Sequence, residues 1–287
     1  MSSNVMMKNS KVSLEIETLG AQIKYIKGAS GKQYLWCGDP DVWAMRAPVL
    51  FPICGGLKDD KFVFEGKEYS LMKHGYGRFK NFEIESCHDD TAVFLHKSDD
   101  ETKELYPFDY EFRIIYKLCG NELHVTYSTK NVYDKTMYFS VGAHEGYACP
   151  EGIEEYNIVF DKTETLDACI LDGTVLSYET KRILENDNVL PLSYELCKMD
   201  SYVFKKLNSR KVSLVHKNGE KVLDVEFEGH DYLLLWTKPD AGYICIEPWC
   251  GIPDSVDSNY DITTKEGIIA LEPGETHEAC HIIRVEE

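Results

Sequence analysis

The sequence has few positive charges and no long apolar run. Its 287 residues include 31 Lys and Arg against 49 Asp and Glu, which gives a net charge of −18. A chain this acidic repels phosphate backbones and anionic lipid surfaces, so neither nucleic acid nor a membrane is an expected partner. No stretch approaches the roughly 18 apolar residues that span a bilayer, and the opening MSSNVMMKNSKV lacks the apolar core of a secretory signal. We therefore expect a cytoplasmic protein.

Paired cysteines are also missing. The ten cysteines are scattered singly along the chain, with no CxxC pair. Disulfide frameworks and zinc knuckles usually cluster their cysteines. We therefore expect reduced thiols that mostly pack as small apolar residues, and we expect no bound metal.

Helical periodicity is scarce, and the commonest pattern is a short alternating or β-branched segment broken by Gly, Asn or Asp. Such segments are typical of antiparallel strands. The clearest are Val12–Thr18, Glu111–Cys119, Glu122–Ser128, Val212–His216 and Val222–Phe227.

Turn and linker signals complete the predicted architecture. Cys119–Glu122 and Lys217–Glu220 have the Gly and Asn residues of tight hairpins. The region Ser193–Phe204 is the only candidate for a short helix or loop, and the charged stretch Lys97–Lys103 is interpreted as a solvated loop. No Pro- or Ser-rich linker divides the chain. The sequence thus predicts an all-β fold, a large antiparallel β-sandwich formed as a single domain by residues 1–287.

Three polar side chains stand where chemistry is plausible. His74 lies between glycines that add no bulk and allow a ligand to approach. His144 follows an apolar strand, and strand ends that open into loops often display binding groups. Glu247 also follows an apolar strand, where partial desolvation would raise its pKa toward that of a useful base. Trp249, two residues on, offers a flat apolar face for a sugar ring.

Each of these residues also has a purely structural interpretation. His74 can close a loop by bonding to backbone, His144 can be a satisfied core histidine, and Glu247 can be a surface carboxylate beside a structural Trp249. Taken one at a time, the three motifs do not decide between the two interpretations.

Five segments in a fixed order strengthen the functional interpretation. RAPVLFPICGG, GKEYSLMKHGYGR, SVGAHEGY, WTKPDAGYICIEPWCGIPDS and LEPGE resemble the aldose 1-epimerase family, most closely its LacX-like branch. The resemblance extends from Arg46 to about Glu275. It implies a β-supersandwich with an open groove and an isomerase that interconverts the anomers of a free hexose without a cofactor.

The resemblance also implies roles for individual residues. His144 matches the general acid that serves the ring oxygen, and His74 matches the histidine that positions that oxygen. Glu247 matches the general base. Asp200, in the segment Met199-Asp-Ser-Tyr-Val-Phe204, matches the acidic residue that binds sugar hydroxyls.

The chain departs from the family pattern at two places. Relatives generally carry Gly-Arg where this chain has Gly55-Gly56, so a sugar-binding arginine is absent there, and Arg46, Lys58 or Arg78 are the candidates to replace it. Glu145 stands where relatives commonly have Pro, and we expect its charge to favour a protonated His144.

One motif competes with this assignment. His277-Glu-Ala-Cys-His281 fits the HExxH pattern of zinc peptidases, in which two histidines lie one helical turn apart. Here the motif follows Pro273-Gly274 and continues into Ile282 and Ile283, which indicates a strand. Residues four apart on a strand are about 13 Å apart, too far to chelate one ion.

Two other functions stay open. A carbohydrate-binding or regulatory protein would keep the groove without turnover. A hexose-phosphate mutarotase would need cations converging on the phosphate, for which Arg46, Lys58, Lys73, Arg78 and Lys80 are available. The expected partner is a small-molecule sugar, and the protein is expected to be a monomer or a homodimer.

Overall fold

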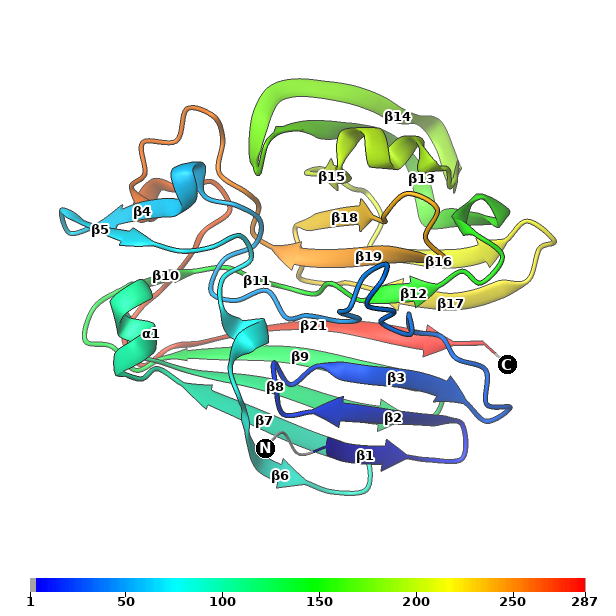
Figure 1. Cartoon of the computed structure of the whole chain (residues 1–287), viewed down its shortest axis with the longest axis horizontal. Coiled ribbons are helices and arrows are strands. Elements are labelled where there is room, and N and C mark those ends of the chain that lie inside the picture. Colours follow the sequence, from blue (N-terminus) through cyan, green and yellow to red (C-terminus); the bar gives the residue numbers. More distant parts are fainter. Residues whose placement is uncertain (1–3, 287) are drawn as a thin grey trace.

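The computed structural model describes residues 4–286 and builds them mainly from antiparallel strands (Figure 1). In these residues the largest sheet has 14 strands. Its main path runs through β11 (Val141–Gly142), β19 (Tyr243–Cys250), β18 (Tyr232–Trp236), β15 (Ser201–Phe204), β13 (Tyr156–Asp172), β16 (Lys211–His216), β17 (Lys221–Glu226), β21 (Thr276–Val285), β9 (Glu122–Asn131), β8 (Tyr110–Cys119), β7 (Thr91–Lys97) and β6 (Glu83–Cys87). Beside this path, β12 (Gly146–Ala148) pairs with β19 and β14 (Val175–Pro191) pairs with β13.

Smaller sheets complete the fold. They are formed by β1 (Asn4–Lys8), β2 (Val12–Glu17) and β3 (Ile23–Gly28), by β4 (Lys61–Phe64) and β5 (Lys67–Ser70), and by β10 (Met137–Phe139) and β20 (Ile269–Leu271). The β1–β3 sheet lies against β7–β9 (Figure 1), and Tyr116 of β8 donates a hydrogen bond to the Ala21 carbonyl at 2.7 Å.

The core follows from the alternation of apolar residues along the strands. On β2, Val12, Leu14 and Ile16 are buried while the residues between them are half-buried. They join one hydrophobic cluster with residues of β7, β8, β9 and β21, because side chains two apart on a strand share a face. This packing confirms the predicted all-β antiparallel sandwich.

The strand and hairpin predictions are confirmed, with two corrections. Lys97–Lys103 is not a simple loop, because Asp99 caps a short helix, α1 (Asp100–Leu105), by accepting a bond from the Thr102 amide while its own amide donates to Thr102 Oγ1. Within Ser193–Phe204 only Tyr194–Met199 is helical, and the four buried residues after Asp200 form β15. None of the helices in residues 4–286 has the length and apolar character needed to cross a lipid bilayer.

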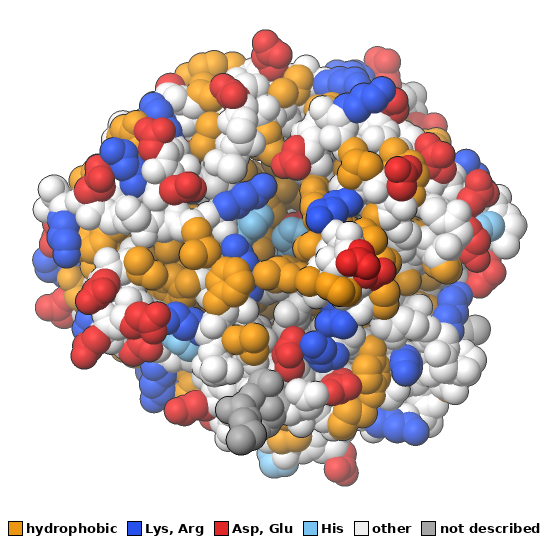
Figure 2. Space-filling view, in the orientation of Figure 1, with side chains coloured by type: hydrophobic (Ala, Val, Ile, Leu, Met, Phe, Trp, Pro, Cys, Tyr) orange, Lys and Arg blue, Asp and Glu red, His pale blue; other side chains and the backbone are white. Residues whose placement is uncertain are grey.

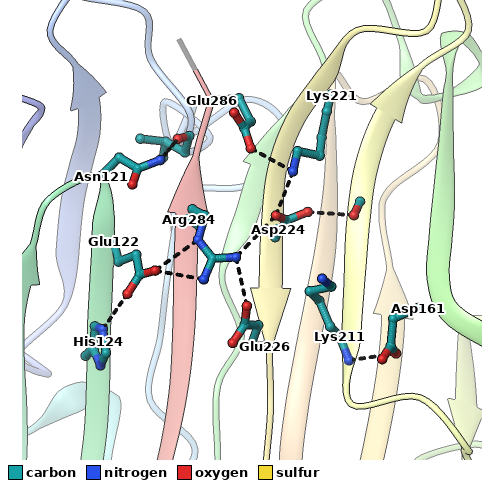
Figure 3. Close-up of polar contacts among 12 residues, drawn as sticks. Asn121, Glu122, His124, Asp161, Lys211, Lys221, Asp224, Glu226, Arg284 and Glu286 are labelled. Carbon is teal, nitrogen blue, oxygen red and sulfur yellow. Dashed lines mark hydrogen bonds and ion pairs between the residues drawn. The ribbon is translucent and has the colours of Figure 1, made fainter.

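The strand β21 joins two parts of the large sheet, because it pairs with β17 on one side and β9 on the other. Charged side chains cross this junction (Figure 3). Arg284 of β21 contacts Glu122 of β9 at 2.7 Å and Glu226 of β17 at 2.8 Å. Cross-strand pairs of opposite charge stabilise a sheet in this register.

The HExxH motif lies on β21, as predicted. His281 is fully buried, and its Nε2 is 3.2 Å from Oε1 of the buried Glu145. Glu278 is exposed and accepts a bond from Ser128 Oγ. His277 and His281 therefore point to one face of the strand and Glu278 points to the other. This arrangement excludes a zinc-peptidase site.

Buried histidines should make the fold sensitive to acid. His96 on β7 is buried, and burial lowers its pKa from 6.5 to about 4. Since the unfolded chain binds a proton near pH 6.5 and the folded chain does not, stability present above pH 6.5 is lost as the pH falls toward 4. We expect His96→Gln to reduce the loss of unfolding free energy between pH 7 and pH 4.5 by about 2 kcal/mol, measured by urea denaturation.

The control is His88→Gln, which changes an exposed histidine on the β6–β7 turn. This variant should lose as much stability as the wild type over the same pH interval. If His96→Gln shows the wild-type loss as well, burial of His96 does not contribute to the acid sensitivity.

Candidate active site

A pocket of about 300 Å³ opens where β19 meets the loops that lead into it. Figure 2 shows histidine surface in a hollow near the middle of this face, with Lys and Arg side chains beside it. All the predicted site residues except Arg46 line the pocket. The lining residues are Trp43, Met45, Pro48, Leu50, Gly55, Lys73, His74, Arg78, Phe79, His144, Leu171, Thr174, Asp200, Ser201, Val203, Leu234, Trp236, Glu247, Trp249 and Pro253.

Glu247 and His144 form a close pair at the pocket wall. All eight residues of β19 are buried, because Ile244 and Ile246 pack into the main core on one face and Tyr243 and Cys245 pack against Trp36, Trp43 and Trp236 on the other. The Glu247 side chain is 2% exposed and that of His144 is 12% exposed, with Nδ1 3.4 Å from Glu247 Oε1. Among residues 4–286, neither His144 Nδ1 nor Glu247 Oε2 has a hydrogen-bond partner.

Burial shifts both members of this pair toward their neutral forms. It raises the pKa of Glu247 well above 4.5, and the charge of Lys73 opposes that shift. Burial, together with the nearby charges of Lys73 and Arg78, lowers the pKa of His144 to about 3. The expectation that Glu145 favours a protonated His144 is wrong, because Glu145 does not line the pocket and instead contacts His281.

His74 is held by reciprocal bonds with Gly55. The His74 amide donates to the Gly55 carbonyl at 2.8 Å, and the Gly55 amide donates to His74 Nδ1 at 3.1 Å. Because Nδ1 accepts a bond, the proton of the neutral ring lies on Nε2, which makes Nε2 a donor. Burial lowers the pKa of His74 well below 6.5, so the ring is neutral at pH 7.

The loop that carries Gly55 is fixed by a buried ion pair. Asp254 Oδ1 lies 3.2 Å from Lys265 Nζ, and these side chains are 5% and 3% exposed. The same carboxylate accepts a bond from the Lys58 amide, and the Asp254 amide donates to the Gly56 carbonyl. The ion pair therefore holds the backbone that orients His74.

The same loop explains the Gly-Gly departure from the family pattern. A Cβ at Gly55, whose φ is +75°, would overlap Pro253. A Cβ at Gly56 would lie 2.6 Å from the Cβ and carbonyl oxygen of Thr174, at the turn between β13 and β14. An arginine does not fit at Gly56 unless this turn moves, and at Gly55 Pro253 and the positive φ exclude one.

Arg78 and Lys73 are the cations at the pocket. Arg78 Nη2 donates to the Lys73 carbonyl at 2.9 Å, and within the described part of the chain its buried Nη1 has no hydrogen-bond partner. Lys73 Nζ lies 3.7 Å from Asp200. Arg46 was predicted to bind substrate, but it does not line the pocket. Its Nε instead donates to the Cys37 carbonyl at 2.7 Å. Lys58, whose Nζ bonds the Ser258 carbonyl, is also outside the pocket.

An aromatic wall surrounds the two histidines. The Trp43 and Trp236 rings lie 5.3 Å and 5.5 Å from the His144 ring, and Trp249 lies edge-on to His74 at 5.5 Å. Sequence reasoning found Trp249 but missed Trp43 and Trp236. Both missed residues lie in or next to segments that carry the resemblance, yet no local pattern shows which way their rings point.

Within residues 4–286, two groups of side chains have the composition of a metal site. Ligand atoms of His144, Cys245 and Glu247 all lie within 4.8 Å of one another, as do those of Cys119, Glu122 and His124. In the second group Glu122 is already bonded to Arg284 and His124 at the surface. The first group is buried at the pocket.

The fold and the pocket define a class of large β-sandwich proteins with a buried carboxylate and two histidines that line one pocket. The sequence model described as Aldose 1-epimerase matches residues 3–284. The chain therefore belongs to the aldose 1-epimerase family.

Three individual proteins are similar to this chain over nearly its whole length. Protein LacX (plasmid) of Lactococcus lactis subsp. lactis is 29% identical over 293 residues, covering 97% of this chain and 98% of the relative. The crystal structure of a galactose mutarotase related enzyme from Lactobacillus acidophilus is 32% identical, with a TM-score of 0.95 over 99% of this chain and 98% of that chain. A galactose mutarotase-like protein from Lactobacillus casei ATCC 334, 23% identical with a TM-score of 0.94 over 99% of this chain and 100% of that chain, has the same fold.

The Lys265–Asp254 pair yields a stability prediction. Lys265→Met leaves the Asp254 carboxylate buried without its counter-ion, which typically costs about 3–5 kcal/mol. Lys205→Met removes a surface pair with Glu266, whose side chains are 30% and 57% exposed, and should cost less than about 1 kcal/mol. Chemical denaturation of both variants measures the difference, and equal losses would contradict the proposed support of the loop.

Proposed function

We propose that the protein interconverts the α and β anomers of a free hexose by general acid/base ring opening. The proposal rests on the His144–Glu247 pair, a buried acid/base couple 3.4 Å apart in a pocket of aromatic and polar side chains. Aromatic faces suit the apolar surfaces of a sugar ring, and Asp200 is an acceptor for its hydroxyl groups. Membership of the aldose 1-epimerase family supports the same reaction class.

Anomer exchange requires two proton transfers. The C1 hydroxyl loses its proton to Glu247 as the bond between C1 and the ring oxygen breaks and the C1 carbonyl forms. His144 delivers a proton to the ring oxygen. After rotation about the C1–C2 bond the ring closes on the other face, and both transfers reverse. Each positioned transfer typically contributes about 10²–10⁴-fold to the rate.

The opposite pKa shifts of the pair fit this scheme if the pair binds one proton. With the proton on Glu247 both groups are neutral, which burial favours. Transfer of the proton to His144 gives a carboxylate and an imidazolium, the form that can accept from C1 and donate to the ring oxygen. The sequence analysis expected His144 to be an imidazolium in the resting enzyme. In this scheme His144 is neutral at rest and becomes an imidazolium during the reaction.

His74 has a supporting role in this proposal. Its Nδ1 accepts a bond from the Gly55 amide, so Nε2 carries a proton that can stabilise negative charge on the ring oxygen. The donor is oriented before the substrate arrives, and no proton needs to leave His74 during the reaction.

Loss of either member of the pair should stop turnover. We expect Glu247→Gln and His144→Gln each to lower kcat for mutarotation of α-glucose or α-galactose by at least about 100-fold, because each removes one proton transfer. Polarimetry measures the rate, and circular dichroism checks the fold. If both variants bind sugar and the wild type also fails to accelerate anomer exchange, the carbohydrate-binding alternative replaces the enzyme.

A second candidate function is mutarotation of a hexose phosphate. The observation that favours it is the buried Arg78 Nη1, which has no hydrogen-bond partner in residues 4–286 and belongs to a cation that lines the pocket. Lys73 lies beside it, and a phosphate oxygen would satisfy both side chains.

Paired substrates separate the two candidates. For the free-hexose enzyme we expect a higher kcat/KM with glucose or galactose than with glucose 6-phosphate in saturation-transfer NMR. Arg78→Met should then lower kcat/KM for the free sugar and the phosphate by similar factors. A preference for the phosphate that Arg78→Met reduces by about 10–100-fold, the value of a lost charge-assisted bond, would support the second candidate instead.

A further inference from the structure

Cys245 lies next to the His144–Glu247 pair, although the proposed reaction does not use it. Cys245 and Glu247 are two residues apart on β19, so their side chains share one face of the strand. The thiol sulfur, a ring nitrogen of His144 and a carboxylate oxygen of Glu247 all lie within 4.8 Å of one another. Cys245 itself is fully buried beneath the aromatic side chains of Trp43 and Trp236.

Two polar atoms of this cluster lack partners. His144 Nδ1 and Glu247 Oε2 are buried and make no hydrogen bond to any residue of the described chain. A buried polar atom without a partner carries a free-energy cost that a bound ion or molecule removes. The Glu247 side chain is only 2% exposed, so bulk water does not solvate its carboxylate.

The chemistry of the cluster selects a particular class of ion. A thiolate, an imidazole and a carboxylate are the ligands that bind zinc, and the sulfur disfavours magnesium and calcium. Three protein ligands leave a fourth position for water or a sugar hydroxyl, since His144 and Glu247 both line the pocket. The surface cluster of Cys119, Glu122 and His124 differs, because Arg284 already donates to its carboxylate and Glu122 and His124 contact each other.

We propose that His144, Cys245 and Glu247 form a binding site for a thiophilic divalent cation, with Zn²⁺ as the representative ion, and that the ion inhibits the enzyme. Binding releases the thiol proton of Cys245 and any proton held between His144 and Glu247 to solvent, with no change of oxidation state. The ion then occupies the lone pairs that the proton transfers need. The inhibitory effect rests on the proposed function, whereas binding of the ion does not.

The spectroscopic test uses Co²⁺ in place of zinc, because a cobalt–thiolate bond has a charge-transfer absorption. All variants carry Cys119→Ser, which removes the surface cluster. We expect one Co²⁺ per chain with a thiolate band in this parent protein and in Cys250→Ser, and no such band in Cys245→Ser. Cys250 is the matched control, since it is a buried cysteine of the same strand whose Sγ contacts the Gly229 carbonyl.

The functional test follows mutarotation during titration with Zn²⁺. The parent protein and Cys250→Ser should lose activity, whereas Cys245→Ser should keep its metal-free activity and need at least about 10-fold more Zn²⁺ for the same inhibition. Cys245→Ala repeats the test if the serine variant does not fold.

The outcomes are distinguishable. A thiolate band that persists in Cys245→Ser, or the absence of a band in the parent protein, would overturn the proposed site. Equal zinc sensitivity of Cys245→Ser and the parent would overturn the inhibitory role. If the parent protein shows the band but no mutarotation at any zinc concentration, the site stands and the proposed function fails.

Discussion

The exclusion of water from β19 is the constraint on which the active site depends. The main core covers one face of β19, and the aromatic side chains of Trp36, Trp43 and Trp236 pack against the other face at Tyr243 and Cys245. A carboxylate in that position cannot rely on solvent, so its charge state is coupled to the nearest titratable group, His144. Burial is the largest cause of both pKa shifts, which run in opposite directions.

Much of the fold could be predicted from local patterns, whereas side-chain direction often could not. The strands around Val12 and Glu122 were predicted well because alternation of apolar residues has an immediate structural meaning. The helix after Asp99 was missed because its signal is a capping box within a charged stretch, which resembles a solvated loop. Cys245 was assigned as an ordinary thiol. Its spacing of two residues from Glu247 indicates a shared face of the strand, but only the structure shows that His144 approaches that face.

The site residues show the same limit. Each motif alone was ambiguous. The order of the motifs along the chain predicted that His74, His144 and Glu247 lie together. Arg46 was assigned to the pocket from its place in a motif, yet its guanidinium bonds backbone elsewhere. Glu145 was expected to act on its neighbour His144, although its carboxylate lies beside His281 of β21. Gly56 stands where the family pattern has an arginine, and in this structure the turn at Thr174 fills the space that a side chain would need.

The position of β21 has a consequence for protein synthesis. This strand lies between β9 and β17, but the ribosome makes it after both of them. Until residues 276–285 have emerged, a nascent chain exposes one unpaired edge of β9 and one of β17. Such edges readily pair with other chains, so the growing polypeptide has a period of aggregation risk that ends when the last of the three strands is inserted. Shielding by chaperones would matter most in that interval.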